Sequence, residues 1–408
     1  MGLASSVERT PRPAPLWTRG FGLLCVVTLL CTSSHQLVTV LLPLYVQSLG
    51  GSPFVAGLVF SSFSITSFLL RPLLGHLADT WSVRGTLLGG GGILGTLALA
   101  FVVPSLGLSI VANAIRGVGW GAFNTAISTA VAVTAPAVRR VEASGYYNLA
   151  STSATAFAPA LALWLLGITG QFPLVFVLAG IAGLAAVVPT LLLPRIGSGT
   201  TSLRRAFALP RDGLTLGTFV DRPVLLASLL LVCVTLSSPV TFAFVPLHAR
   251  AVGVENIGWY FVASGLTSVV ARLSLGRLVD QGSRGMWIAL GYVVLIAGFA
   301  AFIAAHSLGL FIVAAILNAF GLSLSQPTLM ALAIDRAEPS RMGKAMATFS
   351  MFYRVGEGLG APVAGALIDA FGFPAMYMGA IGYAVVGLLL TALNWGAVGK
   401  PIGRAASA

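Results

Sequence analysis

Long apolar runs separated by short polar connections make up most of this chain. A helix needs about 20 mostly apolar residues to cross a bilayer, and twelve runs approach or exceed this length. They cover residues 20–47, 53–75, 85–103, 108–133, 143–166, 173–193, 224–247, 257–278, 286–305, 308–334, 345–368 and 375–395. The pattern predicts an all-α integral membrane protein with twelve transmembrane helices.

One long polar stretch, residues 194–222, divides the twelve runs into six and six. The segment Arg71-Pro-Leu-Leu-Gly-His-Leu-Ala-Asp79 recurs as Arg272-Leu-Ser-Leu-Gly-Arg-Leu-Val-Asp280, 201 residues later. A charged segment repeated about half a chain apart indicates two copies of one unit. We therefore predict two pseudo-symmetric six-helix bundles, residues 1–194 and 223–408, joined by a cytoplasmic linker at residues 195–222.

Composition and charge placement support a membrane protein with a defined orientation. Hydrophobic residues make up 57% of the chain and charged residues only 8%, against about 25% charged in soluble domains. Of the 23 Lys and Arg residues, 18 fall on one side, four lie within or at the ends of runs, and Arg250 stands alone on the other side. The positive-inside rule then predicts that both termini are cytoplasmic.

Because the cations lie between apolar runs, no nucleic-acid partner is expected. With only two Lys among abundant Arg and Ala, we expect the inner membrane of a bacterium.

The segment from Gly75 to Arg84, with the partial copy from Gly276 to Arg284, resembles the G-x-L-a-D-r-x-G-r-R/K loop of the major facilitator superfamily. The resemblance covers the whole chain, although Thr80 and Ser82 depart from the motif. It implies alternating access by two rocking halves and a cytoplasmic gate. The gate residues it implies are Arg71, Gly75, Asp79, Arg84, Arg272, Gly276, Asp280 and Arg284. For Arg71 and Arg272, near the cytoplasmic ends of runs, simple snorkelling to the interface is the favoured interpretation.

Two further family motifs bear on transport direction. The run from Arg116 to Gly121 resembles an element associated with proton coupling, whereas the G-x-x-x-G-P signature of antiporters is altered here. The fifth run has Ala154-x-x-x-Ala158-Pro159, and glycines occupy the matching places only in the eleventh run. The sequence resembles small bacterial efflux members, and this resemblance favours export. The altered antiporter signature lowers the support for export but does not remove it.

Ionisable residues inside a span are costly and mark function by default. Glu357 is the acid placed well inside a run, and Arg354, three residues earlier, is its nearest partner. Either Glu357 carries protons or the two residues form a static structural pair. Arg116 is predicted to act in coupling or in the pathway. His35 is a second proton candidate, with an interhelical hydrogen bond as the alternative.

Polar and aromatic side chains on the same runs predict a central cavity suited to an amphipathic organic solute. The candidate cavity residues are Gln36, Trp120, Asn124, Tyr147, Asn318, Gln326, Tyr353 and Arg354.

Several motifs are missing from the sequence, and their absence narrows the energy source and the class of protein that we expect. There is no phosphate-binding loop, no H-E-x-x-H or G-x-S-x-G motif and no metal-ligand spacing, so we expect neither an enzyme nor a cofactor. A proton gradient, or a sodium gradient, is the expected energy source. We predict a monomeric proton-coupled exporter of a drug or metabolite in the lipid bilayer. The alternatives are a symporter or facilitator that imports a nutrient and, from another class, a membrane receptor or intramembrane enzyme.

Overall fold

The computed structural model describes residues 16–71, 73, 74, 77, 81–134, 136, 139–194, 221–338 and 341–398, with side chains for all of these except 132, 140, 141, 275–281 and 343. Helices joined by short turns account for this part of the chain, and no β-strand occurs in it. The predicted all-α membrane fold is confirmed.

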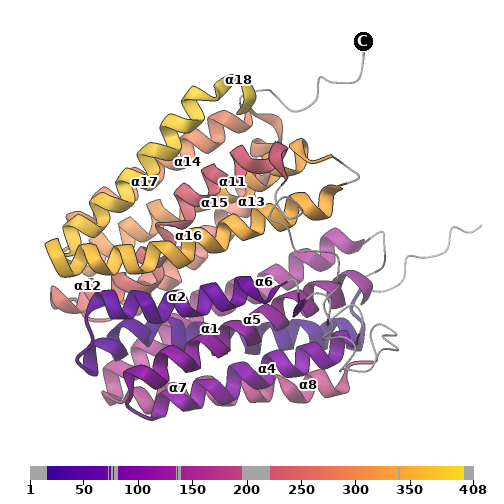
Figure 1. Cartoon of the computed structure of the whole chain (residues 1–408), viewed down its shortest axis with the longest axis vertical. Helices are drawn as coiled ribbons and strands as arrows, with labels where there is room; N and C mark the ends of the chain where they lie inside the picture. Colours follow the sequence, from indigo (N-terminus) through magenta and orange to yellow (C-terminus); the bar gives the residue numbers. More distant parts are fainter. Residues whose placement is uncertain are drawn as a thin grey trace, which may run out of the picture.

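Two groups of helices form the two halves of the molecule (Figure 1). The first group is α1 (Arg19–Ser48), α2 (Pro53–Leu69), α4 (Val83–Leu99) with the 3-10 turn η1 (Ala100–Val102), α5 (Leu106–Thr134), α6 (Arg140–Thr169), α7 (Phe172–Ala185) and α8 (Val187–Leu192). The second group is η3 (Arg222–Val224), α11 (Leu225–Thr235), η4 (Val240–Phe244), α12 (Val245–Ala251), α13 (Gly258–Gln281), α14 (Arg284–Ile303), α15 (Leu308–Arg336), α16 (Met342–Phe371), α17 (Phe373–Leu393) and α18 (Trp395–Val398). The predicted linker lies almost entirely outside the described residues, so the domain boundaries stay a prediction.

Nine helical segments of the described chain are long and apolar enough to cross a membrane. Three more predicted runs, the second, eighth and eleventh, correspond to α2, α13 and α16, which are not among these nine. Only 17 residues of α2 are described as a helix, and α13 and α16 carry ionisable residues such as Arg272 and Glu357. Helices lie at all twelve predicted positions, and nine of them meet the spanning criterion by themselves.

Side-chain caps and prolines explain where several of these helices begin or break. Thr18, Ser52 and Ser82 accept hydrogen bonds from backbone N–H groups in the first turns of α1, α2 and α4, groups that would otherwise be left unsatisfied. The seventh run is interrupted after α11, where Pro239 precedes the π-helical turn η4. Proline removes a backbone donor and bends a helix, so Pro239 accounts for this interruption.

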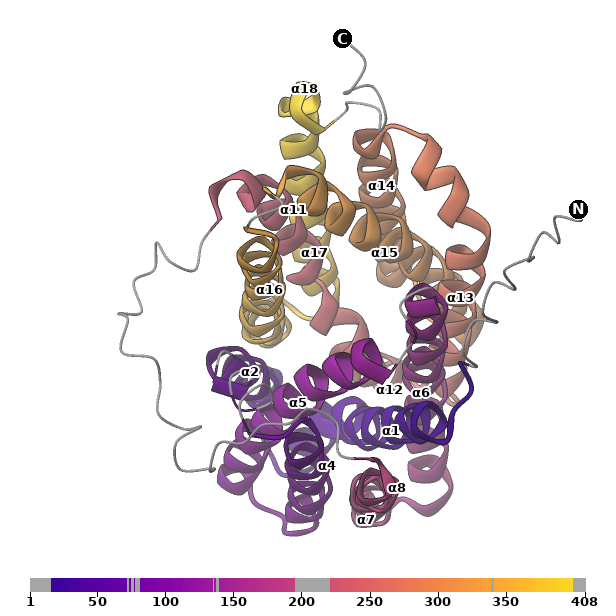
Figure 2. The ribbon, with the colours of Figure 1, turned by 90° about the vertical axis from the view of Figure 1, so that its right-hand side faces the viewer.

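The two halves touch at one end of the molecule and diverge toward the other (Figure 1). At the closed end, where α1 leads into α2 and α16 into α17, Ser52 Oγ donates to Asp369 Oδ2 over 2.7 Å, and Ser61 Oγ donates to the Gly358 carbonyl oxygen. The opposite end carries the starts of α1, α4, α6, α14 and α16. Seen along the long helices, α2 lies beside α16 and α6 beside α13 (Figure 2). The halves therefore form a V that opens away from the Ser52–Asp369 contact.

Candidate functional site

A central cavity of about 260 Å³ lies between the two halves, below the closed end. Its first-half wall is the polar face of α6, and its second-half walls come from η4, α13, α15 and α16. Serine, threonine and asparagine side chains dominate the lining, with aromatic rings and one cation between them. The lining side chains are Asn148, Ser151, Thr152, Thr155, Ser238, Phe242, Phe261, Ser264, Ser268, Arg272, Ala319, Leu322, Ser323, Gln326, Pro327 and Tyr353.

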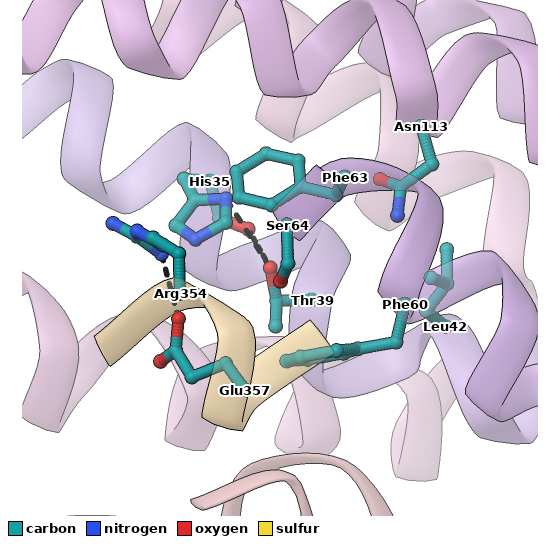
Figure 3. A pocket seen from close by; sticks show the side chains of 9 residues that line it. All are labelled: His35, Thr39, Leu42, Phe60, Phe63, Ser64, Asn113, Arg354 and Glu357. Atoms are coloured by element: carbon teal, nitrogen blue, oxygen red, sulfur yellow. Dashed lines mark hydrogen bonds and ion pairs between the residues drawn. The ribbon is translucent and has the colours of Figure 1, made fainter. Parts of the chain in front are cut away.

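A second, much smaller pocket of about 40 Å³ brings His35 and Thr39 together with the predicted pair of Arg354 and Glu357 (Figure 3). Residues of α1, α2 and α5 form most of it, and Arg354 and Glu357 enter from α16 of the other half. We call His35, Thr39, Arg354 and Glu357 the charge cluster. Because Tyr353 lines the central cavity and its neighbour Arg354 lines the small pocket, α16 joins the two sites.

The ion pair within the charge cluster is compact and largely shielded. Arg354 Nη1 donates to Glu357 Oε2 over 2.7 Å, and their side chains are 20% and 14% exposed. The residues lie three apart on α16, so their side chains leave the same face of the helix. The guanidinium also lies 5.5 Å from the centre of the Tyr353 ring, a cation–π distance. The pair that the sequence predicted is therefore formed, and it sits where the halves meet.

His35 packs against two aromatic rings, and in the described part of the chain it makes no hydrogen bond to another helix. Its ring stacks on Phe63 at 4.6 Å and on Trp120 at 4.2 Å between centroids. Its Nδ1 lies 3.3 Å from Thr39 Oγ1 on the same helix, and Thr39 Oγ1 also donates to the His35 carbonyl oxygen. The stacked ring points into the small pocket with Arg354 (Figure 3).

Arg116 is fully buried and lines neither of these two pockets. Its Nη1 donates to Asn113 Oδ1 over 2.9 Å, and Asn113 in turn donates to the Val59 carbonyl oxygen of α2. Nε and Nη2 of Arg116 have no hydrogen-bond partner in the described part of the chain. A buried cation with unpaired donors is costly, so a functional role for Arg116 stays a prediction. Arg116 is linked to the small pocket through Asn113, which lines that pocket.

The remaining predicted cavity residues divide into two groups. Gln326 and Tyr353 line the central cavity, as expected. The others pack elsewhere: Asn124 donates to the Trp120 carbonyl oxygen on its own helix, Gln36 and Asn318 are buried between helices, and Tyr147 packs against a core cluster of the first half. Trp120 contacts the charge cluster by stacking on the His35 ring.

Of the predicted gate residues, Arg71, Arg84 and Arg284 are described at the open end, and the contacts of Arg84 and Arg284 stay within one half. Arg84 donates to the Leu191 carbonyl oxygen, and Arg284 Nε donates to Asp335 Oδ2 over 2.6 Å. Arg71 is exposed. Gly75 and Asp79, and the side chains of Gly276 and Asp280, lie outside the described residues, so the gate stays a prediction. Arg272 is the exception, because it lines the central cavity.

The polar face of α6 is not among the residues predicted from the sequence. Asn148, Ser151, Thr152 and Thr155 follow one another at spacings of three, one and three residues, which places them on one side of a helix. A search for hydroxyl and amide periodicity in the fifth run would have found them. The same test on the eighth run groups Ser264, Ser268 and Arg272.

Comparisons with known proteins identify the class to which this fold and cavity belong. The sequence profile of the Major Facilitator Superfamily matches residues 24–255 and 240–404. An uncharacterized MFS-type transporter of Burkholderia mallei (strain SAVP1) is 25% identical, over 99% of this chain and all of the relative. The staphylopine export protein of Staphylococcus aureus (strain Mu50 / ATCC 700699) is 21% identical, over 87% of this chain and 91% of its own. The crystal structure of a mutant of the nucleoside transporter NupG superposes with a TM-score of 0.75 at 15% identity, covering 91% of this chain and 99% of its own.

The chain therefore belongs to the Major Facilitator Superfamily. It is a multi-pass membrane protein that transports a small molecule, and it is a carrier, not an enzyme. The family resemblance read from the loop motif is confirmed.

Proposed function

We propose that this protein is a proton-coupled exporter of a small organic solute that works by alternating access in the plasma membrane of a bacterium. The observation that carries the proposal is the charge cluster. It places a shielded carboxylate where the two halves meet, on the helix that also lines the central cavity.

The ion pair offers a physical route from protonation to conformational change. When Glu357 is ionised, it compensates Arg354, and the pair tolerates a pocket with little water. Protonation removes this compensation and leaves a shielded guanidinium unpaired, which costs several kcal/mol. A state in which the two halves separate around Arg354 and hydrate it then becomes more favourable. Proton binding at Glu357 thus biases the equilibrium between the two openings.

The distribution of cations supports an opening toward the cytoplasm. Among the described cations outside the cavity and pockets, Arg19, Arg139, Arg222 and Arg341 lie at the open end, and Arg250 lies at the closed end. The positive-inside rule places the open end in the cytoplasm. In this conformation a cytoplasmic solute reaches the central cavity directly, as the first step of export requires. Similarity to a relative whose name is staphylopine export protein supports the same direction.

Inside-out vesicles that contain the protein test both direction and coupling. The probe is an equimolar mixture of labelled hydroxylated carboxylic acids, their amides and the corresponding amines. Acidifying the vesicle lumen should drive accumulation of transported solute, because exported substrate moves into the lumen as protons leave. Solute that instead leaves preloaded vesicles under the same gradient would establish symport and overturn the proposal of export.

Glu357→Gln tests the proton carrier. We expect gradient-driven accumulation to fall about tenfold or more, since a few kcal/mol of coupling are lost. Exchange of solute at equal pH on both sides should persist, because it needs no net proton movement. The matched control is Glu142→Gln, which removes an acid that pairs with Arg139 outside the site. Full gradient-driven accumulation by Glu357→Gln would eliminate Glu357 as the carrier.

A further inference from the structure

The central cavity differs from the charge cluster in its net charge. Within its described lining Arg272 is the sole cation, and no aspartate or glutamate is present. The four ion pairs of the described chain are Arg139–Glu142, Arg284–Asp335, Arg341–Glu338 and Arg354–Glu357, and none includes Arg272. Among the described side chains, therefore, no carboxylate pairs with the positive charge that Arg272 supplies to the cavity.

The position of Arg272 makes this charge accessible to a solute inside the membrane. Arg272 lies 14 residues beyond Gly258, the first residue of α13, which is about 21 Å along the helix from the closed end. The side chain is exposed, and it follows Ser264 and Ser268 along the cavity face of α13. An unpaired cation at such a depth is expected to serve a substrate pathway. Its planar guanidinium matches the two oxygens of a carboxylate.

The polar lining also indicates which hydrogen-bonding groups the solute must carry. Thr155 Oγ1 donates its hydrogen to the Ser151 carbonyl oxygen, and Ser268 Oγ donates to the Ser264 carbonyl oxygen. A hydroxyl that has donated its hydrogen to its own helix keeps only acceptor capacity toward the cavity. These oxygens therefore require hydrogen-bond donors on the solute.

We infer that the transported solute is a small organic anion with hydroxyl or amino donors, whose carboxylate binds Arg272. The inference rests on the proposed transport through this cavity and adds the substrate class. Phe242, Phe261 and Tyr353 supply an apolar wall for its carbon skeleton. A cavity of about 260 Å³ is below the usual range of about 300–1,000 Å³ for drug-sized sites, which favours a metabolite-sized solute. An organic cation of the same shape meets only repulsion from Arg272.

Three probes of one shape isolate the role of charge: 4-hydroxyphenylacetate, 4-hydroxyphenylacetamide and tyramine. Binding to the detergent-purified protein, measured without a proton gradient, should follow the order anion, amide, cation. Arg272→Gln should lower the affinity for the anion by about tenfold to a hundredfold, the range expected for a charge-assisted hydrogen bond. Arg272→Lys should retain part of it, since lysine keeps the charge but loses the planar fork. Arg250→Gln, at the exposed closed end, is the control for loss of one cation and should bind as the wild type does.

The outcomes separate this inference from the proposed function. Three results overturn the substrate class. The first is a preference for tyramine or for the amide, and the second is binding of none of the three probes. The third is anion binding that is equal in the wild type and Arg272→Gln. Gradient-driven transport of amines in vesicles would uphold export while overturning the anion. Arg272-dependent anion binding without any gradient-driven transport would uphold the substrate class while the coupled exporter fails. A normal size-exclusion profile of both Arg272 variants shows that they fold.

Discussion

The halves meet along two contacts that the internal repeat makes equivalent, α2 with α16 and α13 with α6, yet the two contacts are built differently. In the α2–α16 contact the backbones approach closely. A Cβ atom on Gly57 would lie 2.7 Å from both the Ala361 carbonyl carbon and Pro362 Cα, and one on Gly365 would lie 2.7 Å from Phe54 Cα. Such distances leave space only for hydrogen. Hydrogen bonds from Ser61 and Ser52 add to this contact.

The α6–α13 contact differs in having empty space on both sides. Gly258 approaches Ala160 and Gly265 approaches Ala156, without a hydrogen bond between the two helices in the described part. The central cavity lies on the inner side of this contact. An apolar crevice of about 760 Å³ lies on its outer side, between α1, α6 and α13, with Trp164 and Trp259 among its walls. The difference indicates that α2–α16 holds the closed end together, whereas α6–α13 borders the space through which solute moves.

The largest effect is expected from Gly57→Leu, which forces α2 and α16 apart. Because the neighbouring atoms are backbone, neither helix can yield by rotating a side chain. We expect the closed end to open, with a loss of transport of about tenfold or more, as overpacking costs about 1–3 kcal/mol or more. Spin labels at Gln47 and Val252, which belong to different halves at the closed end, should show a longer distance.

Gly358 on the same contact provides the matched control. A Cβ on Gly358 would lie 3.6 Å from Ser64 Cβ, an ordinary van der Waals distance. Gly358→Ala should therefore keep both the short label distance and the transport rate, and Gly57→Ala should fall between the two. If Gly57→Leu retained the wild-type distance and activity, the tight contact would have no role in holding the end closed.

A smaller effect is expected from Asp369→Asn at the same end. Asp369 Oδ2 accepts hydrogen bonds from Ser52 Oγ and from Phe54 N in the first turn of α2, so a carboxylate of one half caps a helix of the other. A negative charge at a helix N-terminus is worth about 0.3–1 kcal/mol, which corresponds to a shift of about twofold to fivefold in the closed population. The label distance distribution measures this shift.

Salt provides the control for the charge, because the contact is exposed. The difference between wild type and Asp369→Asn should shrink as ionic strength rises and screens the interaction. A difference that persists at high salt would mean that hydrogen-bond geometry, and not charge, stabilises the contact.

The sequence predicted the architecture well because the bilayer imposes strong constraints on composition. Run length, charge asymmetry and the repeat of Arg71–Asp79 gave the all-α fold, and the Arg354–Glu357 pair followed from helical spacing. Assigning side chains to the cavity was harder. Asn124 and Asn318 are polar residues within spans, as Gln326 is, but interhelical packing and not residue type decides which of the three faces the cavity. The cavity position of Arg272 was missed for the same reason, since residue type and place in the run do not show which way its side chain is directed.

The smallest effect is expected from Gly265→Ala, in the α6–α13 contact. The added Cβ would lie 3.0 Å from Ala156 Cα and closer still to its Cβ, so by distance alone this substitution resembles Gly57→Ala. Here, however, the cavity and the crevice allow α6 and α13 to separate slightly without disturbing a packed core. We expect a change in transport rate of about twofold, roughly 0.4 kcal/mol, because the two helices can move apart without disturbing a packed core. Ala156→Gly, added to Gly265→Ala, should restore any loss, since it removes the opposing methyl group. If Gly265→Ala instead impaired transport as much as Gly57→Ala, the two contacts would be equally strict, and the surrounding empty space would not make α6–α13 the more adaptable of the two.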